Sequence, residues 1–199
     1  MKTEELKQRI LNGCSAVKGA EPRLTEIDSK FGDADHGLTM TKIADAITKA
    51  LQESDGTIQA MMTDVADAVG ELNGGSAVPL WNSWLGGMAE AAPDSDSIDT
   101  AQLQEMFAAG LDEFDFMSGA AVGDKTIMDA LAPATEAINQ ASTEEELFTS
   151  AAAAAMQGAE STKNFTAKYG RAKSYGEKTL GTEDAGALSM AYFFKGMAE

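Results

Sequence analysis

Apolar residues recur at the three- and four-residue spacing of amphipathic helices along most of the chain. Leu6, Ile10, Cys14 and Val17 form the first such face, and Thr3 is the expected N-cap of that helix. The same spacing predicts a short helical segment at 22–29 and helices at 37–53, 58–72, 79–92, 103–114, 126–139, 142–168 and about 188–193. No stretch alternates with the two-residue period of a strand, so the sequence predicts a single all-α domain over residues 1–199 with about eight antiparallel helices.

Glycines and capping residues suggest where these helices break. Gly86 and Gly87 are expected to interrupt the fifth helix, and residues 170–184 to form a long loop punctuated by glycines. The run from Ser142 to Glu145 looks like a capping box for the helix that follows it.

Composition narrows the choice of partners. The 199 residues include 32 acidic and 15 basic side chains, a formal net charge of -17, which disfavours nucleic acid and anionic membranes as partners.

Cys14 is the only cysteine, so no internal disulfide is expected, and its place on an apolar helical face predicts a core residue. The first residues are acidic and lack an apolar run, which argues against a signal peptide. A cytoplasmic protein is therefore expected.

The densest chemistry lies at a predicted helix–loop–helix junction. Asp28, Asp33 and Asp35 fall within eight residues, separated by small residues that allow a sharp turn. Two carboxylates about 4 Å apart near a protein surface repel each other by roughly 4 kcal/mol. A divalent cation would relieve this repulsion, and a set of oxygen ligands favours Mg²⁺, Mn²⁺ or Ca²⁺ over zinc.

Other interpretations of this junction differ in how well they fit. An EF-hand needs a glycine at loop position six and an acid at position twelve, but counting from Asp28 these places hold Asp33 and Thr39. A turn closed by aspartate caps needs no metal and stays open at this point. His36, the only histidine, is expected in the first turn of the next helix, where free amides favour a phosphate, although a hydrogen-bonded bystander fits as well.

Glycine-rich segments recur at other predicted helix junctions. Residues 73–77 and 123–126 each begin a helix, residues 170–172 begin the long loop, and residues 183–186 end it at a further helix start. The backbone amides of such segments can hold phosphate oxygens, although each segment alone is more typical of a turn or a helix C-cap. Neither GxxxxGK[ST] nor GxGxxG occurs, so the common phosphate motifs are excluded.

Taken in order, these segments resemble one family over nearly the whole chain. LTEIDSKFGDADHGLTM, NGGSAVPLW, VGDKTIMDAL and KYGRAKSYGEKTLGTEDAGALS are similar to the nucleotide-binding L subunit of the phosphotransferase-system-dependent dihydroxyacetone kinase. That subunit matches the C-terminal domain of ATP-dependent dihydroxyacetone kinases. The resemblance implies an antiparallel up-and-down barrel of about eight helices with the nucleotide at one end.

The resemblance also implies roles for individual residues. Asp28, Asp33 and Asp35 would bind two Mg²⁺ ions that bridge the phosphates, and these acids with Arg171 would form the catalytic set. The residues implied along bound ADP or ATP are His36, Gly37, Leu38, Thr39, Ser76, Ala77, Gly119, Met128, Arg171, Asp184, Ala185 and Gly186.

The chain departs from the family pattern in two loops. Ala77 and Val78 stand where the family usually has Ser-Gly, so a hydroxyl contact to phosphate is lost or passes to Ser76. Ala185 stands where the family usually has proline, which is expected to loosen that loop. His36 is typical of the dihydroxyacetone branch, since related fatty-acid kinase domains carry threonine there.

The resemblance implies two protein partners: a phosphohistidine donor that rephosphorylates bound ADP, and a separate subunit that holds dihydroxyacetone. Three alternatives stay open: a kinase subunit for another small ketose, a nucleotide-dependent module that acts on a transcription factor, and a helical scaffold with a fortuitous acidic turn. Whether two copies form a homodimer is also left open.

Overall fold

The computed structural model describes residues 1–199, and its regular structure is helical throughout. One isolated bridge between Lys2 and Ser97 is its only β-type pairing. The all-α prediction is therefore confirmed. The elements are α1 Thr3–Gly19, α2 Glu21–Asp28, α3 His36–Glu53, α4 Ile58–Gly70, α5 Ala77–Ala91, α6 Thr100–Ser118, α7 Met128–Gln140, α8 Glu144–Ser161, the 3-10 helices η1 Thr162–Asn164 and η2 Arg171–Thr179, and α9 Ala185–Met197.

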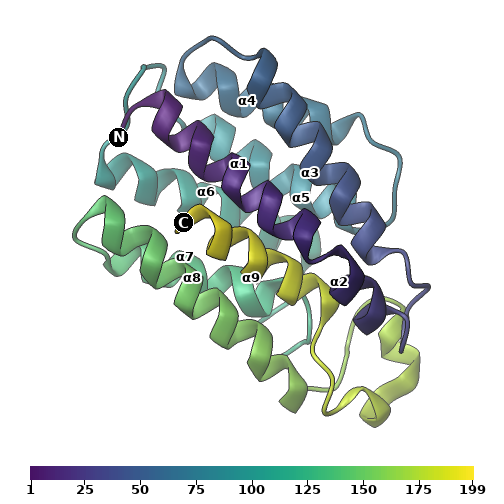
Figure 1. Ribbon diagram of the computed structural model, residues 1–199. Helices are drawn as coiled ribbons and strands as arrows, with labels where there is room; N and C mark the ends of the chain where they lie inside the picture. The colour runs from purple at the N-terminus through teal and green to yellow at the C-terminus, as the bar shows by residue number, and fades with distance from the viewer.

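The eight long helices form a closed ring, as the resemblance implied. Each of α1, α3, α4, α5, α6, α7, α8 and α9 packs against the next, and α9 returns to pack against α1. Short connections make most consecutive helices antiparallel, while α8 and α9 are joined by the long segment that carries η1 and η2. The short helix α2 lies at one end of the ring, beside the loop that carries η2 (Figure 1).

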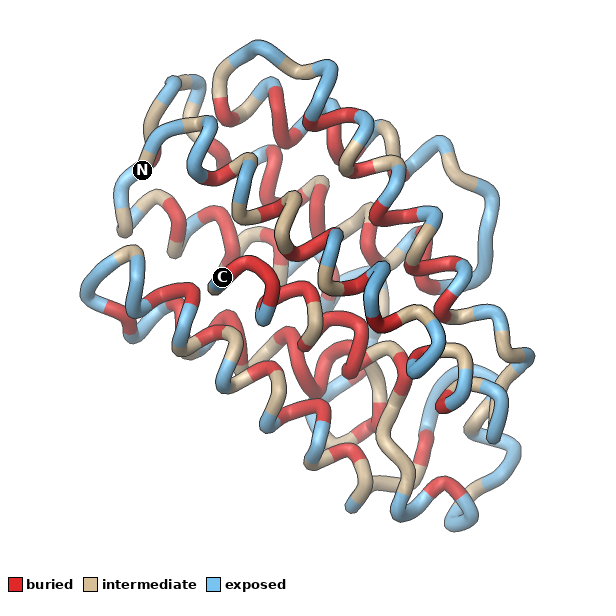
Figure 2. The backbone as a smooth tube through the Cα atoms, in the orientation of Figure 1, coloured by how far each residue is buried: buried red, intermediate tan, exposed pale blue.

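Large aromatic side chains fill the interior. Trp81 and Trp84 of α5 lie with their ring centroids 5.2 Å and 5.6 Å from that of Phe193 in α9. Buried residues face inward from every helix of the ring, while exposed residues lie on the outer faces and the loops (Figure 2). Cys14 is buried in this core as predicted, and burial raises the pKa of its thiol to about 12.

The predicted break in α5 and the predicted N-cap of α1 are wrong. The helix α5 runs unbroken through Gly86 and Gly87 to Ala91. Gly87 is there for packing, because a Cβ atom at this position would lie 2.5 Å from the carbonyl oxygen of Ala109 in α6. In α1, Lys2 is the N-cap, and Thr3 is the first helical residue.

The predicted end of α8 is also wrong, because the helix stops at Ser161 and not near Lys168. The Thr162 hydroxyl donates to the carbonyl oxygen of Ala159 and accepts from the backbone N–H of Asp184, so the chain turns away. The following loop is partly ordered as η2. At the other end of α8, Thr143 is the N-cap, one residue after the predicted start of the capping box.

The molecule contains no helix that is both long and apolar enough to cross a bilayer.

Candidate functional site

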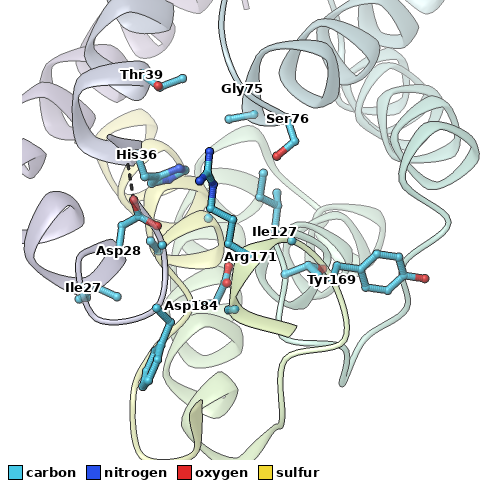
Figure 3. Close-up of a pocket in the computed structure, with 18 of the residues that line it drawn as sticks. Ile27, Asp28, His36, Thr39, Gly75, Ser76, Ile127, Tyr169, Arg171 and Asp184 are labelled. Atoms are coloured by element: carbon cyan, nitrogen blue, oxygen red, sulfur yellow. Dashed lines mark hydrogen bonds between the residues drawn. The ribbon is translucent and has the colours of Figure 1, made fainter. Parts of the chain in front are cut away.

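A pocket of about 320 Å³ lies at the end of the ring where α2 and η2 meet. Four stretches that are far apart in sequence line it: the α2–α3 junction, the start of α5, the approach to α7, and the segment from Tyr169 to Gly186 (Figure 3). Only 8 of its 23 lining residues are hydrophobic, so the pocket suits a charged or polar ligand more than an apolar one.

The three predicted metal ligands converge in this pocket. Oxygen atoms from Asp28, Asp33 and Asp35 lie within 4.8 Å of one another. The carboxylate of Asp28 accepts hydrogen bonds from the backbone N–H groups of Asp35, at 3.1 Å, and His36, at 3.4 Å. Gly32 is required for this arrangement, because a Cβ atom there would lie 2.0 Å from Oδ1 of Asp28.

The acid cluster is only partly neutralised by the protein. Arg171 places its guanidinium 2.6 Å from a carboxylate oxygen of Asp33. Burial, followed by the charge of Asp33, raises the pKa of the Asp35 carboxyl. Three carboxylates and one guanidinium leave about two negative charges unbalanced when all are ionised. One divalent cation would neutralise them.

His36 is the first residue of α3 and is partly buried at the pocket wall. Its Nε2 lies 3.1 Å from the hydroxyl of Ser189 in α9. Burial lowers the pKa of the ring, and the nearby Asp28 carboxylate acts in the opposite direction. Of the first-turn amides of α3, that of His36 already donates to Asp28, while those of Gly37 and Leu38 have no helical partner, so this helix start can receive a phosphate oxygen.

Two further helix starts form the opposite walls. Ser76 is the N-cap residue of α5, and its hydroxyl makes no capping bond, so the group is available to a ligand. Asp184 is the N-cap of α9 and accepts from the backbone N–H of Ala187 at 2.8 Å. Burial raises the pKa of Asp184 to about 6. Gly186 permits close contact with the next wall, since a Cβ atom there would lie 2.8 Å from the side chain of Ile127.

Most of the predicted site residues share this pocket. Those that line it are Asp28, Asp33, Asp35, His36, Thr39, Ser76, Ala77, Arg171, Asp184, Ala185 and Gly186.

Four predicted residues lie behind or outside this lining. Gly37 packs against α2, and the side chain of Leu38 points to solvent. Gly119 ends α6, where its carbonyl oxygen accepts from the Tyr169 hydroxyl at 2.7 Å. Met128 is buried one residue after the pocket residue Ile127.

Several lining residues had no predicted role, among them Leu80, Lys125, Tyr169 and Glu183, although Lys125 and Glu183 lie in the glycine-rich segments 123–126 and 183–186. Tyr169 directly precedes the Gly-Arg pair of the predicted phosphate loop, so its position was a usable signal. Leu80 gave none, because an apolar residue in a helix is normally assigned to the core.

The DAK2 domain family model matches residues 30–199, which is most of the chain. The chain belongs to the DAK2 domain family. The predicted resemblance is thus confirmed. The matched region includes the whole segment from Tyr169 to Gly186 and all of the acid junction except its first residues, among them Asp28.

Curated relatives of this DAK2 domain fall into two groups by length. The L-erythrulose 1-kinase of Mycolicibacterium smegmatis is 34% identical over 90% of this chain and 32% of its own length. The chain therefore spans about a third of that kinase. The ADP-binding subunit of the PEP-dependent dihydroxyacetone kinase 1 of Listeria innocua is 32% identical over 88% of this chain and 85% of its own length. The ADP-binding subunit of the PEP-dependent dihydroxyacetone kinase of Escherichia coli is 30% identical, over 94% of this chain and 92% of its own length.

Solved structures share the fold. The dihydroxyacetone kinase of C. freundii in its native form superposes with a TM-score of 0.77 at 24% identity, covering 100% of this chain and 34% of that one. The same kinase in complex with AMP-PNP and Mg²⁺ gives a TM-score of 0.73 at 22% identity. The barrel of the DAK2 domain described here is therefore a known architecture.

Proposed function

We propose that this DAK2 domain is the ADP/ATP-binding phosphotransfer subunit of a dihydroxyacetone-type kinase. Bound ADP would take a phosphoryl group from a phosphohistidine donor protein, and the ATP formed would pass it to dihydroxyacetone held on a separate subunit. The observation that carries the proposal is the convergence of Asp28, Asp33, Asp35 and Arg171 in one polar pocket between helix starts. The likeness to ADP-binding subunits over 85% and 92% of their lengths supports it.

The acid cluster fits magnesium. Its donors are carboxylate oxygens alone, the chemistry that Mg²⁺ prefers, and they lie close enough for a shared ion. We propose that Asp28, Asp33 and Asp35 hold two Mg²⁺ ions, the charge beyond that of the acid cluster being balanced by the phosphates of the nucleotide. When bound, magnesium would neutralise charge on the phosphates of the nucleotide.

The roles proposed for the other site residues follow from where they lie around the pocket. Phosphoryl transfer requires mainly alignment and charge neutralisation, so no covalent residue is needed. In the proposal, the start of α3 from His36 to Thr39 lies along the phosphates, with Ser76 and Ala77 opposite and Arg171 neutralising charge. Residues 184–186 would close over the sugar end, and Gly119 and Met128 would support the wall behind the base. Residues 1–199 would act as one domain, since α9 closes the ring against α1.

Two ketoses are specific candidates for the substrate, dihydroxyacetone and L-erythrulose. Two of the relatives named above are dihydroxyacetone kinase subunits, and another acts on L-erythrulose by name. Supplying the purified domain with a donor phosphoprotein and a substrate-binding subunit, and then with each ketose in turn, would separate them.

Native mass spectrometry provides the central test. We expect the purified protein to carry ADP and magnesium, and Asp33→Ala to lose both. Asp55→Ala, which removes an exposed aspartate from the turn before α4, should retain them. A parent protein that binds no ADP in the presence of magnesium, and transfers no phosphoryl group when partners are supplied, would refute the proposal.

A further inference from the structure

Lys125 is a buried cation at the base of the pocket. Only 4% of the residue is exposed, and its backbone has a φ of 62°, which is unusual for a residue other than glycine. Its ammonium donates hydrogen bonds to the carbonyl oxygens of Thr162, at 2.6 Å, and Thr182, at 2.5 Å. The burial cost of such a charge is offset only when it has well-placed partners.

The two carbonyls bonded by Lys125 stand at opposite ends of one loop. We call residues 163–183 the Arg171 loop, after the residue that reaches the acid cluster. Its ends meet at a narrow neck, where the backbone N–H of Gly181 donates to the carbonyl oxygen of Lys163 at 2.8 Å. The backbone N–H of Asp184 donates to the hydroxyl of Thr162 at 2.8 Å in the same place. Lys125 is therefore a third link across this neck, contributed by a different part of the chain.

Beyond the neck, the Arg171 loop contacts the acid junction at two points. Arg171 pairs with Asp33, and the ring of Tyr175 lies 5.2 Å from that of Phe31. Figure 3 shows Arg171 and Asp184 entering the pocket from this side, opposite Ser76. Both contacts are made by residues beyond the neck, so the neck sets how the segment that carries Arg171 enters the pocket.

We infer that Lys125 is a positioning residue: its ammonium fixes the two ends of the Arg171 loop and so holds Arg171 at the mouth of the pocket. A consequence that rests on the proposed function is slow release of the bound nucleotide, since the loop covers one side of the pocket. Lys125 lines the pocket, but two of its three N–H donors are already used by Thr162 and Thr182. Its role is therefore in the loop and not as a direct ligand of phosphate.

Amide hydrogen exchange of the nucleotide-free protein tests the positioning role directly. Lys125→Met removes the ammonium and keeps much of the side-chain volume. We expect the amides of Gly181 and Asp184 to exchange at least roughly tenfold faster, the scale of a lost charged hydrogen bond, while α1 and α4 are unchanged. Lys125→Gly also relieves the backbone strain and should give the same local loosening, which separates the ammonium from the strained backbone.

Lys163→Met is the matched control, because it removes a cation at the same neck. Lys163 pairs with the exposed Glu160, a contact that is worth little, and at 3.7 Å with the largely buried Glu183. Arg23 also pairs with Glu183, at 3.0 Å, so exchange at Gly181 and Asp184 should stay near that of the parent. Equal exchange in the parent and in both Lys125 variants would overturn the inference. So would faster exchange in every helix of Lys125→Met, since that indicates only a global loss of stability.

Nucleotide kinetics test the consequence for retention. We expect Lys125→Met to release ADP at least roughly tenfold faster, with the association rate little changed. A loss of affinity that grows from AMP to ADP to ATP would instead indicate direct phosphate contact and would overturn the positioning role. A parent protein that binds no ADP would refute the proposed function, while the exchange experiment would still decide the role of Lys125.

Discussion

Arg171 of η2 and Asp33 of the α2–α3 junction form an ion pair with a nitrogen–oxygen distance of 2.6 Å at the mouth of the pocket. The side chain of Arg171 is 70% exposed, so this contact is readily exchanged for another. Asp33 is also one of the three converging carboxylates. In the proposed site, a guanidinium and a divalent cation would therefore compete for the same carboxylate group.

This competition predicts opposite effects for Arg171→Gln. Without nucleotide, the variant should bind Mg²⁺ more tightly, by up to about fivefold, because an exposed ion pair contributes at most about 1 kcal/mol. With magnesium present, it should bind ADP more weakly, since a cation that reaches the phosphates is lost. Calorimetric titration of each ligand measures both effects. Lys2→Gln is the control, because it breaks an exposed ion pair with Asp96 and should change neither affinity. Weaker Mg²⁺ binding by Arg171→Gln would contradict the competition.

A methyl group at residue 32 should disrupt the acid cluster. In Gly32→Ala the new Cβ atom would lie 2.0 Å from Oδ1 of Asp28, so the carboxylate has to move. We expect Mg²⁺ affinity to fall by at least roughly tenfold, the cost of displacing one charged ligand. The helical signal in circular dichroism should be unchanged. Gly19→Ala is the control, because no atom lies within 4 Å of its added Cβ. Retained Mg²⁺ affinity in Gly32→Ala would exclude Asp28 as a ligand.

The acid junction and the ring of helices were predictable because their signals are local. Helical spacing identifies the inner faces, and three aspartates between small residues identify a sharp turn. The position of Gly37 was not predictable, since only the packed structure shows that α2 occupies the space a side chain would need. The end of α8 depends on bonds from Thr162 to a residue 22 positions later, which no local pattern records.

Lys125 shows the same limit at the site itself. In the sequence it is one residue of a glycine-containing loop, with nothing to indicate that its ammonium reaches two carbonyls more than 30 positions away. Buried lysines are rare, so sequence reasoning places such a residue in solvent.

Cys14 should be unreactive in the native protein. Burial raises the pKa of its thiol to about 12, and the thiolate is the form that alkylating reagents attack. At about pH 8, iodoacetamide should label the protein slowly when folded and rapidly in denaturing urea, where the pKa returns to about 8.5. Mass spectrometry follows the added group. Rapid labelling of the folded protein would place Cys14 outside the core.

Asp184 should make stability depend on pH in a defined direction. Burial raises its pKa in the folded protein to about 6, against about 3.9 when unfolded, so the fold favours the protonated carboxyl. That contribution is complete below about pH 4 and is lost as the pH rises through about 6.

Asp184→Asn removes this titration while leaving an oxygen able to cap α9. The free energy of unfolding of the parent, relative to the variant, should therefore fall by about 1–2 kcal/mol between about pH 4 and pH 7, with partial exposure of Asp184 limiting the effect. Urea denaturation without nucleotide or magnesium measures the difference at each pH. Asp99→Asn, at the exposed N-cap of α6, reports the effect of the amide replacement alone. A parent that gains stability relative to Asp184→Asn over this range would show that the pKa of Asp184 lies below its unfolded value, so that the fold favours the ionised carboxylate.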